Sequence, residues 1–379
     1  MTGQVLPTHH NRSSVNFFHT HVSAKAIEYA NEALRTGWLS EGPRVKQFEA
    51  ALSERLGVVN AVCLNSGTSA LHLALALAGV GPDDEVILPA QTFVATGLTI
   101  LMQAGKPVFA DVDPQSGNLC PKSLLRKITG RTKAVIPVHW AGYPCDLDEI
   151  NAVAAKHGLA VIEDAAHALG ATYRGKPVGA ISRFTCFSFQ AIKHLTSGDG
   201  GALCCLHAED AREAFVRRWF GIDRASSQPS ILGERLYDIT AVGYKYHLND
   251  LGAALGLGNL DDFPRRLARR QAIAAEYRRG LAGVPGATLL RHESDRESAC
   301  WLFTLLVERR EDFVRKLAAA GVPTSVVHVR IDHNSVFGGI RDDLTGQAWF
   351  NDRQISLPVH EALTEDDVQR VISAIRAGW

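Results

Sequence analysis

The amino-acid sequence predicts an α/β protein, with a mostly parallel central sheet flanked by helices and a smaller C-terminal α+β domain. Short β-rich runs alternate with helical stretches over the first two thirds of the chain, which is typical of a parallel sheet covered by helices on both faces. The alternation stops near Pro264, and 379 residues are enough for a large core and one smaller companion. We therefore expect a large domain, including the N-terminal segment, over residues 1–262 and a small domain over residues 263–379.

The large domain opens with two expected helices, at residues 23–36 and 45–56, which end at Gly37 and Gly57 because glycine favours helix termination. A third helix is expected at residues 68–78, where apolar residues precede two more glycines. Short β-rich runs predict the strands of the sheet, which lie at residues 61–65, 85–90, 107–112, 133–140, 160–165 and 201–207.

A long basic amphipathic helix is expected at residues 264–283, where it would bridge into the small domain. Its arginines predict a solvated face rather than a nucleic-acid stripe, because no aromatic residues interleave with them. Another helix is expected at residues 311–321, and a final one opens at Thr364 with acidic residues in its first turn. Apolar segments complete the α+β pattern, at residues 287–292, 301–308 and 325–330.

Composition excludes several classes of function. Forty basic and forty acidic residues balance, so we expect no binding to nucleic acid or to an anionic membrane surface. No apolar run approaches the ~20 residues of a membrane helix. The start, MTGQVLPTHHNRSS, lacks an export signal, and seven cysteines without a CxxC pair indicate reduced thiols, so we expect a cytoplasmic protein. The irregular spacing of His9, His10, His19 and His21 predicts no metal site.

Two polar motifs follow predicted strands, and ligands of open α/β sheets gather where strands end. Ser66–Gly67–Thr68–Ser69 brings backbone N–H groups and hydroxyls to a helix N-terminus, which suits a phosphate, although an ordinary N-cap has the same pattern. Asp164 ends the strand at residues 160–165, with His167 just beyond. A buried carboxylate needs a partner. This one is either the N-cap of the next helix or the partner of a ring nitrogen.

Lys193 follows a buried apolar run and precedes TSGDGG, whose glycines permit a tight turn. A desolvated lysine has a lowered pKa and forms a Schiff base with an aldehyde. A phosphate, a pyridine nitrogen and an aldehyde are combined in pyridoxal 5′-phosphate, and an acid such as Asp164 keeps the ring nitrogen protonated so that the ring acts as an electron sink. The three groups together therefore predict this cofactor.

The chain also resembles the sugar aminotransferases of the DegT/DnrJ/EryC1/StrS family, which have the fold type I (aspartate aminotransferase-like) architecture of pyridoxal phosphate enzymes. The likeness spans nearly the whole chain. It is carried by the motifs GWLSEGPRVKQFE, NSGTSALHLAL, DEVILPAQTFVAT, FADVDP, VIEDAAHALGA, FSFQAIKHLTSGDGG, GYKYHLNDLGAALGLGNL and ISLPVHEALTEDDVQRVI.

The resemblance implies a role for each matching residue. Lys193 would bond to the cofactor aldehyde and move the proton between the cofactor carbon and the substrate carbon. Asp164 would pair with the pyridine nitrogen, and His167 would lie near the ring oxygen or the phosphate. Phe93 would stack on the ring, with core packing as the alternative for this side chain. The phosphate would be held by Gly67, Thr68, Ser69 and Ser188.

One motif departs from the family pattern. Where the family often has GxNYR, this chain has Lys245 in place of the asparagine and His247 in place of the arginine. In relatives the asparagine reaches the phosphate of the neighbouring subunit's cofactor. Lys245 would do so with a full charge, unless it is an ordinary surface lysine. The substrate contact from position 247 stays open.

The implied reaction transfers an amino group from glutamate to a keto group, at C3 or C4, of a nucleotide-linked deoxy sugar, by way of pyridoxamine 5′-phosphate. A homodimer with a shared active site is expected. Trp38 and His328 are candidate substrate contacts, although Trp38 equally fits a core position. The alternatives are a cyclitol aminotransferase, a sugar dehydratase that uses the same cofactor, and a non-catalytic regulatory homologue. Lys193 argues against the dehydratase, and the intact set of Lys193, Asp164 and the phosphate site argues against the silent homologue.

Overall fold

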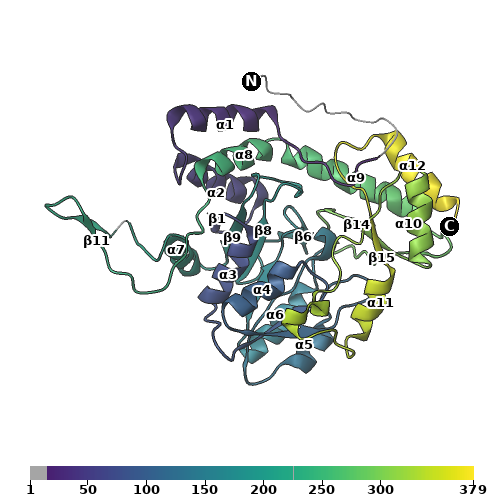
Figure 1. Ribbon diagram of the computed structural model, residues 1–379, viewed down its shortest axis with the longest axis horizontal. Coiled ribbons are helices and arrows are strands. Elements are labelled where there is room, and N and C mark those ends of the chain that lie inside the picture. The colour runs from purple at the N-terminus through teal and green to yellow at the C-terminus, as the bar shows by residue number, and fades with distance from the viewer. Residues whose placement is uncertain (1–14, 225) are drawn as a thin grey trace.

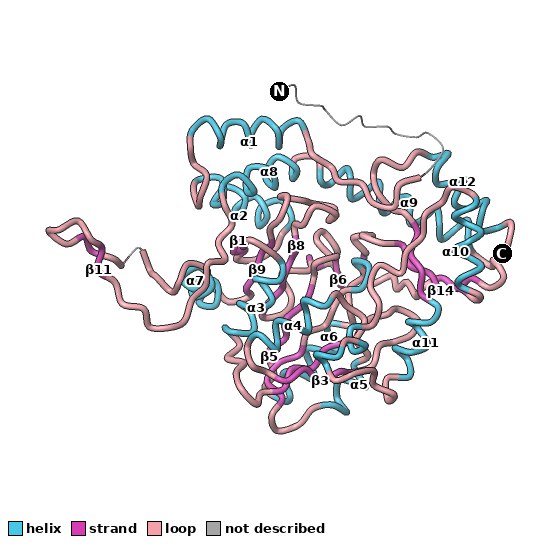
Figure 2. The backbone as a smooth tube through the Cα atoms, in the orientation of Figure 1, coloured by secondary structure: helices cyan, strands magenta, loops and turns pink. Residues whose placement is uncertain are grey.

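The computed structural model describes residues 15–224 and 226–379. A seven-stranded sheet with strand order β1-β9-β8-β5-β4-β2-β3 forms the centre of the larger part of the molecule. Strand β9 runs antiparallel to both of its neighbours, whereas the other pairings are parallel. Figures 1 and 2 show helices packed around this sheet. The predicted mostly parallel α/β sheet is confirmed.

The strands of the central sheet are short and largely buried, which explains why they read as apolar runs rather than as alternating patterns. Adjacent parallel strands end at one edge of the sheet, so the residues that follow them come together there. The strands are β1 (Ala61–Leu64), β2 (Glu85–Pro89), β3 (Lys106–Ala110), β4 (Thr132–Val135), β5 (Ala160–Asp164), β8 (Phe184–Ser188) and β9 (Gly201–Cys205).

Helices α1 and α2 end as predicted, at Gly37 with φ 75° and Gly57 with φ 69°, in the left-handed conformation that glycine adopts readily. In the described part of the chain, no helix is long and apolar enough to cross a membrane. The helices of the larger part are α1 (Ala24–Thr36), α2 (Pro43–Leu56), α3 (Gly67–Leu77), α4 (Val94–Met102), α5 (Pro121–Lys127), α6 (Leu147–His157), α7 (Ala208–Arg217) and α8 (Asp250–Leu260), with a 3-10 turn at Trp140–Gly142.

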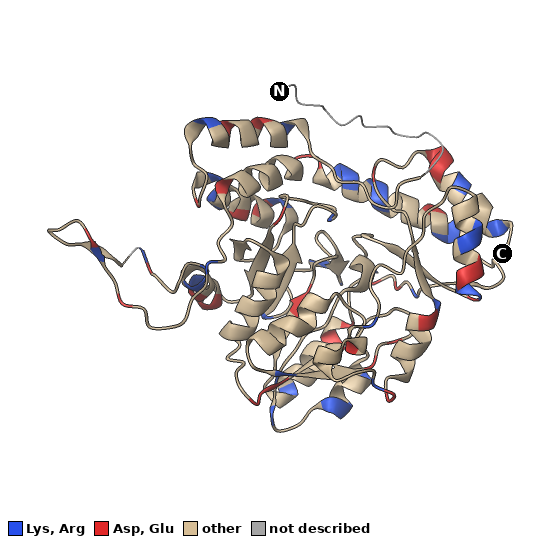
Figure 3. Ribbon diagram, in the orientation of Figure 1, with Lys and Arg blue, Asp and Glu red and all other residues tan. Residues whose placement is uncertain are grey.

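Helix α9 (Phe263–Leu281) runs from the larger part of the molecule to the C-terminal part, and its basic residues are blue in Figure 3. The expectation that its arginines form a solvated face is wrong for Arg266 and Arg270, which are 2% and 3% exposed. Arg266 donates hydrogen bonds to the carbonyl oxygens of His194 and Asn259. Arg270 donates to the carbonyl of Val359. These bonds tie the helix to both parts, which periodicity alone does not reveal.

The C-terminal part has an antiparallel sheet of β12 (Ala287–Leu289), β14 (Phe303–Val307) and β15 (Gln354–Leu357), as expected for an α+β unit. The final helix begins after Thr364, whose hydroxyl and the Asp367 carboxylate form a reciprocal capping box. The helices here are α10 (Arg310–Ala319), α11 (Thr345–Arg353) and α12 (Glu365–Arg376), with 3-10 turns at Ile331–His333 and Ser335–Phe337.

Two smaller sheets were not expected from the sequence. One combines β6 (Thr172–Tyr173), β7 (Lys176–Pro177) and β13 (Arg296–Glu297) and so joins the two parts of the chain. The other is the hairpin of β10 (Gln228–Pro229) and β11 (Arg235–Leu236), which projects away from the body of the molecule (Figure 1). Strands of two residues are too short to be seen in hydrophobic periodicity.

The described start of the chain packs against the C-terminal part. The Val15 N–H donates to the carbonyl oxygen of Gly321 at 3.2 Å, and the ring of Phe18 stacks on Trp301. The predicted boundary at residue 262 precedes the first residue of α9. The division into two domains at this point stays a prediction.

The N-terminal histidines have ordinary partners where the structure describes them. His19 pairs with Glu361 at 3.1 Å, and His21 pairs with Asp262 at 3.1 Å. The first 14 residues, which include His9, His10 and the stretch expected to lack an export signal, lie outside the described residues.

Candidate active site

A cavity of about 430 Å³ lies at the carboxyl ends of strands β1, β2, β5 and β8. Each of these strands delivers at least one predicted residue, either at its last position or in the segment that follows. The predicted residues that line the cavity are Gly67, Thr68, Phe93, Asp164, His167, Ser188, Lys193 and His328.

Lys193 stands in the loop after β8, where its amine lies 3.8 Å from the centre of the Trp301 ring. The indole N–H of Trp301 donates to the carbonyl oxygen of Ile192 at 3.1 Å, so the ring is fixed to the segment that carries the lysine. Loss of hydration lowers the pKa of Lys193 to about 7, against the opposing effect of Asp164. A lysine with this pKa is a nucleophile near neutral pH.

Asp164 is 6% exposed at the end of β5. One carboxylate oxygen accepts a hydrogen bond from the Thr96 hydroxyl at 2.7 Å, and the other accepts from the Ala166 N–H at 3.2 Å. Burial raises the pKa of Asp164, whereas these two donors and Lys193 oppose the rise. No ion pair compensates its charge within the described residues, so the acid fits a cationic partner such as a protonated ring nitrogen.

His167 and His328 each have one buried ring nitrogen without a hydrogen-bond partner in the described part of the chain. The atom is Nδ1 in His167 and Nε2 in His328. Their rings are 5.6 Å apart, and His167 also stacks on Trp301 with ring centres 3.8 Å apart. Burial lowers the pKa of His167 well below its usual value and that of His328 to about 4, so both rings are neutral. Buried polar atoms without partners are typical of sites that bind a ligand.

Helix α3 begins at the end of β1, and its N-cap Ser66 accepts the Ser69 N–H at 3.0 Å. The N–H groups of Gly67 and Thr68 belong to the first turn, where a helix provides no internal acceptor. A Cβ atom at Gly67 would lie 2.9 Å from the Cβ of Ser188, so only glycine lets the helix start this close to β8. The arrangement suits a phosphate. Ser69 itself does not line the cavity, and its hydroxyl donates to Asn65.

Three predicted residues differ in how they relate to the cavity. Phe93 is 55% exposed and its ring centre is 5.3 Å from that of His328, so the alternative of core packing is excluded. Trp38 is 56% exposed, which also excludes a core position, but it does not line the cavity. Lys245 lies outside the cavity as well, with its amine 4.7 Å from the centre of the Trp219 ring. The roles assigned to these residues stay predictions.

Sequence reasoning missed Thr96 and Trp301. Thr96 lies within the quoted motif AQTFVAT, three residues after Phe93 on α4, so helical spacing was an available signal. Trp301 comes from the segment before β14 and meets Lys193 only in three dimensions, so no local pattern could reveal it.

The segment at residues 325–330, which the sequence includes in the expected α+β pattern, does not form a strand. Val327 has φ 61°, and the His328 N–H donates to the carbonyl of Val326 at 2.8 Å, which makes a γ-turn. A positive φ is unfavourable for a β-branched residue and is typical of functional sites. The turn directs the His328 ring to the cavity.

An α/β sheet that gathers an amine, an under-compensated acid and a helix N-terminus in one cavity defines the class of pyridoxal phosphate-dependent enzymes. The residues present fit this cofactor, because the start of α3 could hold its phosphate and Asp164 could accept a hydrogen bond from its protonated ring nitrogen. The chain belongs to the DegT/DnrJ/EryC1/StrS aminotransferase family, whose profile matches residues 21–376. The predicted family and the predicted aminotransferase class are confirmed.

Individual relatives agree with this assignment. The sugar aminotransferase CalS13 from Micromonospora echinospora is 38% identical, with a TM-score of 0.91 over 96% of this chain and 100% of that one. The spore coat polysaccharide biosynthesis protein SpsC of Bacillus subtilis is 38% identical over 94% of each chain. The PLP form of Spr1654 from Streptococcus pneumoniae is 30% identical, with a TM-score of 0.88 over 96% of this chain and 98% of that one, and a PMP form is also known. These two forms agree with the predicted cofactor.

Proposed function

We propose that this protein is a pyridoxal phosphate-dependent sugar aminotransferase that moves an amino group from glutamate to the C3 or C4 keto group of a nucleotide-linked deoxy sugar. The observation that carries the proposal is the convergence of Lys193, Asp164 and the start of α3 on one cavity. When bound there, the cofactor supplies an electron sink and holds the amino group between the two half-reactions.

Each side chain of the cavity has a task in this proposal. Lys193 moves a proton at its Nζ atom, because its lowered pKa lets it both accept and release one near neutral pH. Asp164 keeps the ring nitrogen protonated. The neutral His167 provides a ring nitrogen to the cofactor oxygen or phosphate, and Phe93 covers the ring face. The phosphate is held by Gly67, Thr68 and Ser188, whereas a contact from Ser69 would require its hydroxyl to leave Asn65.

The sugar assignment is supported by the relatives, because CalS13 is a sugar aminotransferase and SpsC belongs to polysaccharide biosynthesis. His328 suits a sugar, since it lines the cavity and its Nε2 has no hydrogen-bond partner among the described residues. Trp38 is the second proposed substrate contact. A cyclitol ketone offers similar oxygens, so it remains the second acceptor to be tested.

A homodimer with a shared active site is part of the proposal. The β10–β11 hairpin leaves the body of the molecule with Ile231 and Leu232 fully or largely exposed, and a second copy would bury such an arm. Lys245 lies near the base of this arm and would reach the partner's cofactor phosphate. All seven cysteines are free thiols, which supports a reducing, cytoplasmic location.

The deciding experiment is a glutamate-dependent amination screen over nucleotide-linked 3-keto and 4-keto deoxy sugars and cyclitol ketones, read by product mass. We expect one nucleotide sugar to gain an amino group while 2-oxoglutarate accumulates. Borohydride should fix the cofactor on Lys193 of the wild-type protein and leave the Lys193→Ala variant unlabelled. Amination of a cyclitol ketone alone would overturn the sugar assignment, and labelling of the alanine variant would overturn the role of Lys193.

A further inference from the structure

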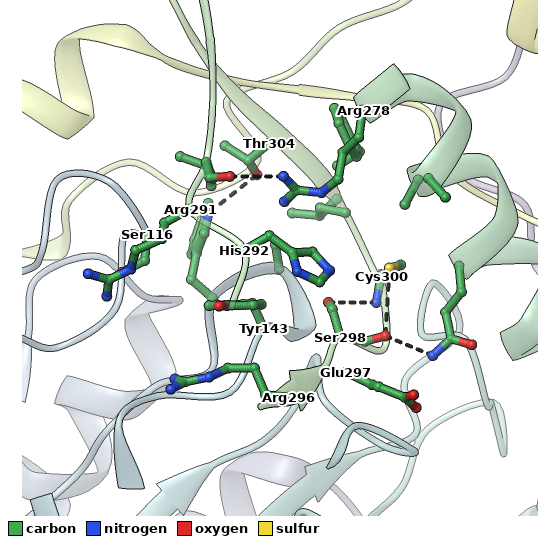
Figure 4. Close-up of a pocket in the computed structure, with 18 residues that line it drawn as sticks. Ser116, Tyr143, Arg278, Arg291, His292, Arg296, Glu297, Ser298, Cys300 and Thr304 are labelled. Carbon is green, nitrogen blue, oxygen red and sulfur yellow. Dashed lines mark hydrogen bonds between the residues drawn. The ribbon is translucent and has the colours of Figure 1, made fainter. Parts of the chain in front are cut away.

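A second cavity, of about 350 Å³, lies between helix α9, the 3-10 turn Trp140–Gly142 and the segment at residues 290–304 (Figure 4). It shares no lining residue with the active-site cavity. Trp140 stands between the two, since it lines the second cavity while its ring also contacts His167 and His328. Nothing in the proposed reaction uses this second space.

Arg278 brings a positive charge into the second cavity from the last turn of α9. Its guanidinium donates one hydrogen bond, to the carbonyl oxygen of Leu290 at 3.0 Å, and lies 5.9 Å from the centre of the Phe303 ring. No carboxylate forms an ion pair with it among the residues that the structure describes. Burial lowers the pKa of Arg278, which reflects a charge without compensation.

The other charged side chains that line this cavity either form ion pairs or lie at the end opposite Arg278. Arg291 pairs with Asp113 at 2.7 Å, and Arg296 pairs with Asp146 at 2.8 Å. Glu297 also lines the cavity, but Figure 4 places it at the opposite end from Arg278, with the ring of His292 between them. The guanidinium of Arg278 is therefore the cation that a bound anion would meet.

The rest of the lining is suited to an apolar body. The rings of Tyr143 and His292 lie 6.2 Å apart at 49°. Aliphatic and aromatic side chains close the remaining wall, namely those of Ala274, Leu290, Leu302 and Phe303. A cavity of this size, with a largely apolar wall and a limited number of polar groups, is typical of small-molecule sites.

We propose that this second cavity binds a small organic anion, a carboxylate or phosphate on an apolar or aromatic body, with Arg278 as its anchor. A guanidinium forms two parallel hydrogen bonds with such an anion, and four of its five N–H donors remain available after the bond to Leu290. The competing explanation is that Arg278 only neutralises the carboxyl end of α9, which is a common use of basic residues.

The test is a ligand-observed NMR titration of the cofactor-loaded enzyme with benzoate, and with benzamide as the neutral analogue of the same shape. Benzoate should bind saturably, and Arg278→Gln should weaken it about tenfold, as expected for the loss of a charge-assisted bond. Arg279→Gln is the matched control, because Arg279 is exposed, shares the last turn of α9 and does not line the cavity.

Arg278→Lys keeps the charge and should retain part of the benzoate affinity, and circular dichroism should confirm that each variant is folded. Benzamide should bind more weakly than benzoate and should not respond to Arg278→Gln. Equal benzoate affinity in the wild type and in Arg278→Gln would overturn the proposal, as would the absence of saturable binding. Equal losses in the Arg278 and Arg279 variants would assign the effect to the helix end instead.

Discussion

Glu163 and Asp164 are neighbours on strand β5, and both carboxyl groups are buried. Because they lie on opposite faces of the strand, their surroundings differ. Glu163 accepts hydrogen bonds from His139 at 2.7 Å and from the Ser182 N–H at 3.1 Å. The Cys145 N–H donates to Nδ1 of His139, which leaves the proton on Nε2 and directs it to Glu163.

Asp164, on the other face, has two donors and no cation of its own. We infer that Glu163 is a structural acid, satisfied within the chain, and that Asp164 is a functional one, which would pair with the ring nitrogen of the cofactor. A buried acid is common to both, so burial alone would not have distinguished them. Two observations distinguish them: Glu163 has a third donor, the Thr185 hydroxyl at 3.4 Å, and Asp164 lines the cavity whereas Glu163 does not.

The largest expected effect is on catalysis by Asp164→Asn. The amide cannot stabilise a protonated ring nitrogen, so kcat for the sugar amination should fall at least ~100-fold, equivalent to about 3 kcal/mol. Without the cofactor, the variant should unfold at no lower denaturant concentration than the wild type, because it removes a buried uncompensated charge. Steady-state kinetics and urea unfolding check both statements. Normal kcat would contradict the proposed pairing with the ring nitrogen.

The reverse behaviour is expected for Glu163→Gln. An amide has one oxygen fewer to accept from the His139 and Ser182 donors, so a buried donor loses its partner and the free energy of unfolding should fall by about 1–3 kcal/mol. The activity of the folded fraction should stay within about threefold of the wild type, by inference from the position of Glu163 on the face away from the cavity. If Glu163→Gln instead lost activity without losing stability, the contrast between the two acids would fail.

The pH dependence of cofactor uptake tests the cavity that Asp164 lines, because it reports the pKa of Lys193. The neutral amine of Lys193 is the reactive form, and its fraction grows as pH rises through the pKa of about 7. Covalent uptake of pyridoxal phosphate by the cofactor-free protein should therefore rise about tenfold per pH unit below pH 7 and level off above it. Stopped-flow absorbance measures the rate. A rate that keeps rising to pH 10 would show an ordinary, hydrated lysine.

The smallest effect is expected for Thr96→Val, which removes one of the two donors to Asp164 and keeps the side-chain shape. The loss should cost about 1 kcal/mol and lower kcat about fivefold. Thr99→Val is the control, because the Thr99 hydroxyl donates only to the carbonyl oxygen of Thr96 within the same helix. The same loss in both variants would mean that the helix, rather than the bond to Asp164, is responsible.

Much of the site was accessible from the sequence because strand ends converge by topology. Asp164, Lys193 and Gly67 are far apart in the chain, but each follows a strand of one sheet, so the order of elements already places them together. The family motifs then give each of them a role. The sheet itself was predictable for the same reason, since its strands are buried on both faces and read as apolar runs.

The remainder depends on contacts that no local pattern contains. Trp301 reaches Lys193 from the segment before β14, and the burial of Arg266 follows from acceptors on the loop after β8 and on helix α8. The γ-turn at Val327 puts this residue in a strained backbone conformation, and the apolar sequence of the segment does not predict it. Lys245 and Trp38 lie outside the cavity of one chain, so the roles proposed for them would require the proposed homodimer.

The position of Trp301 also has a consequence for how the protein is made. Lys193 leaves the ribosome more than a hundred residues before Trp301, and His328 follows later still. The Lys193 amine therefore lacks its contact with the Trp301 ring until the C-terminal sheet has been synthesised and has packed against the rest of the chain. We therefore expect loading of the vitamin-derived group to be a late event in biogenesis, after the cavity that would enclose it has formed.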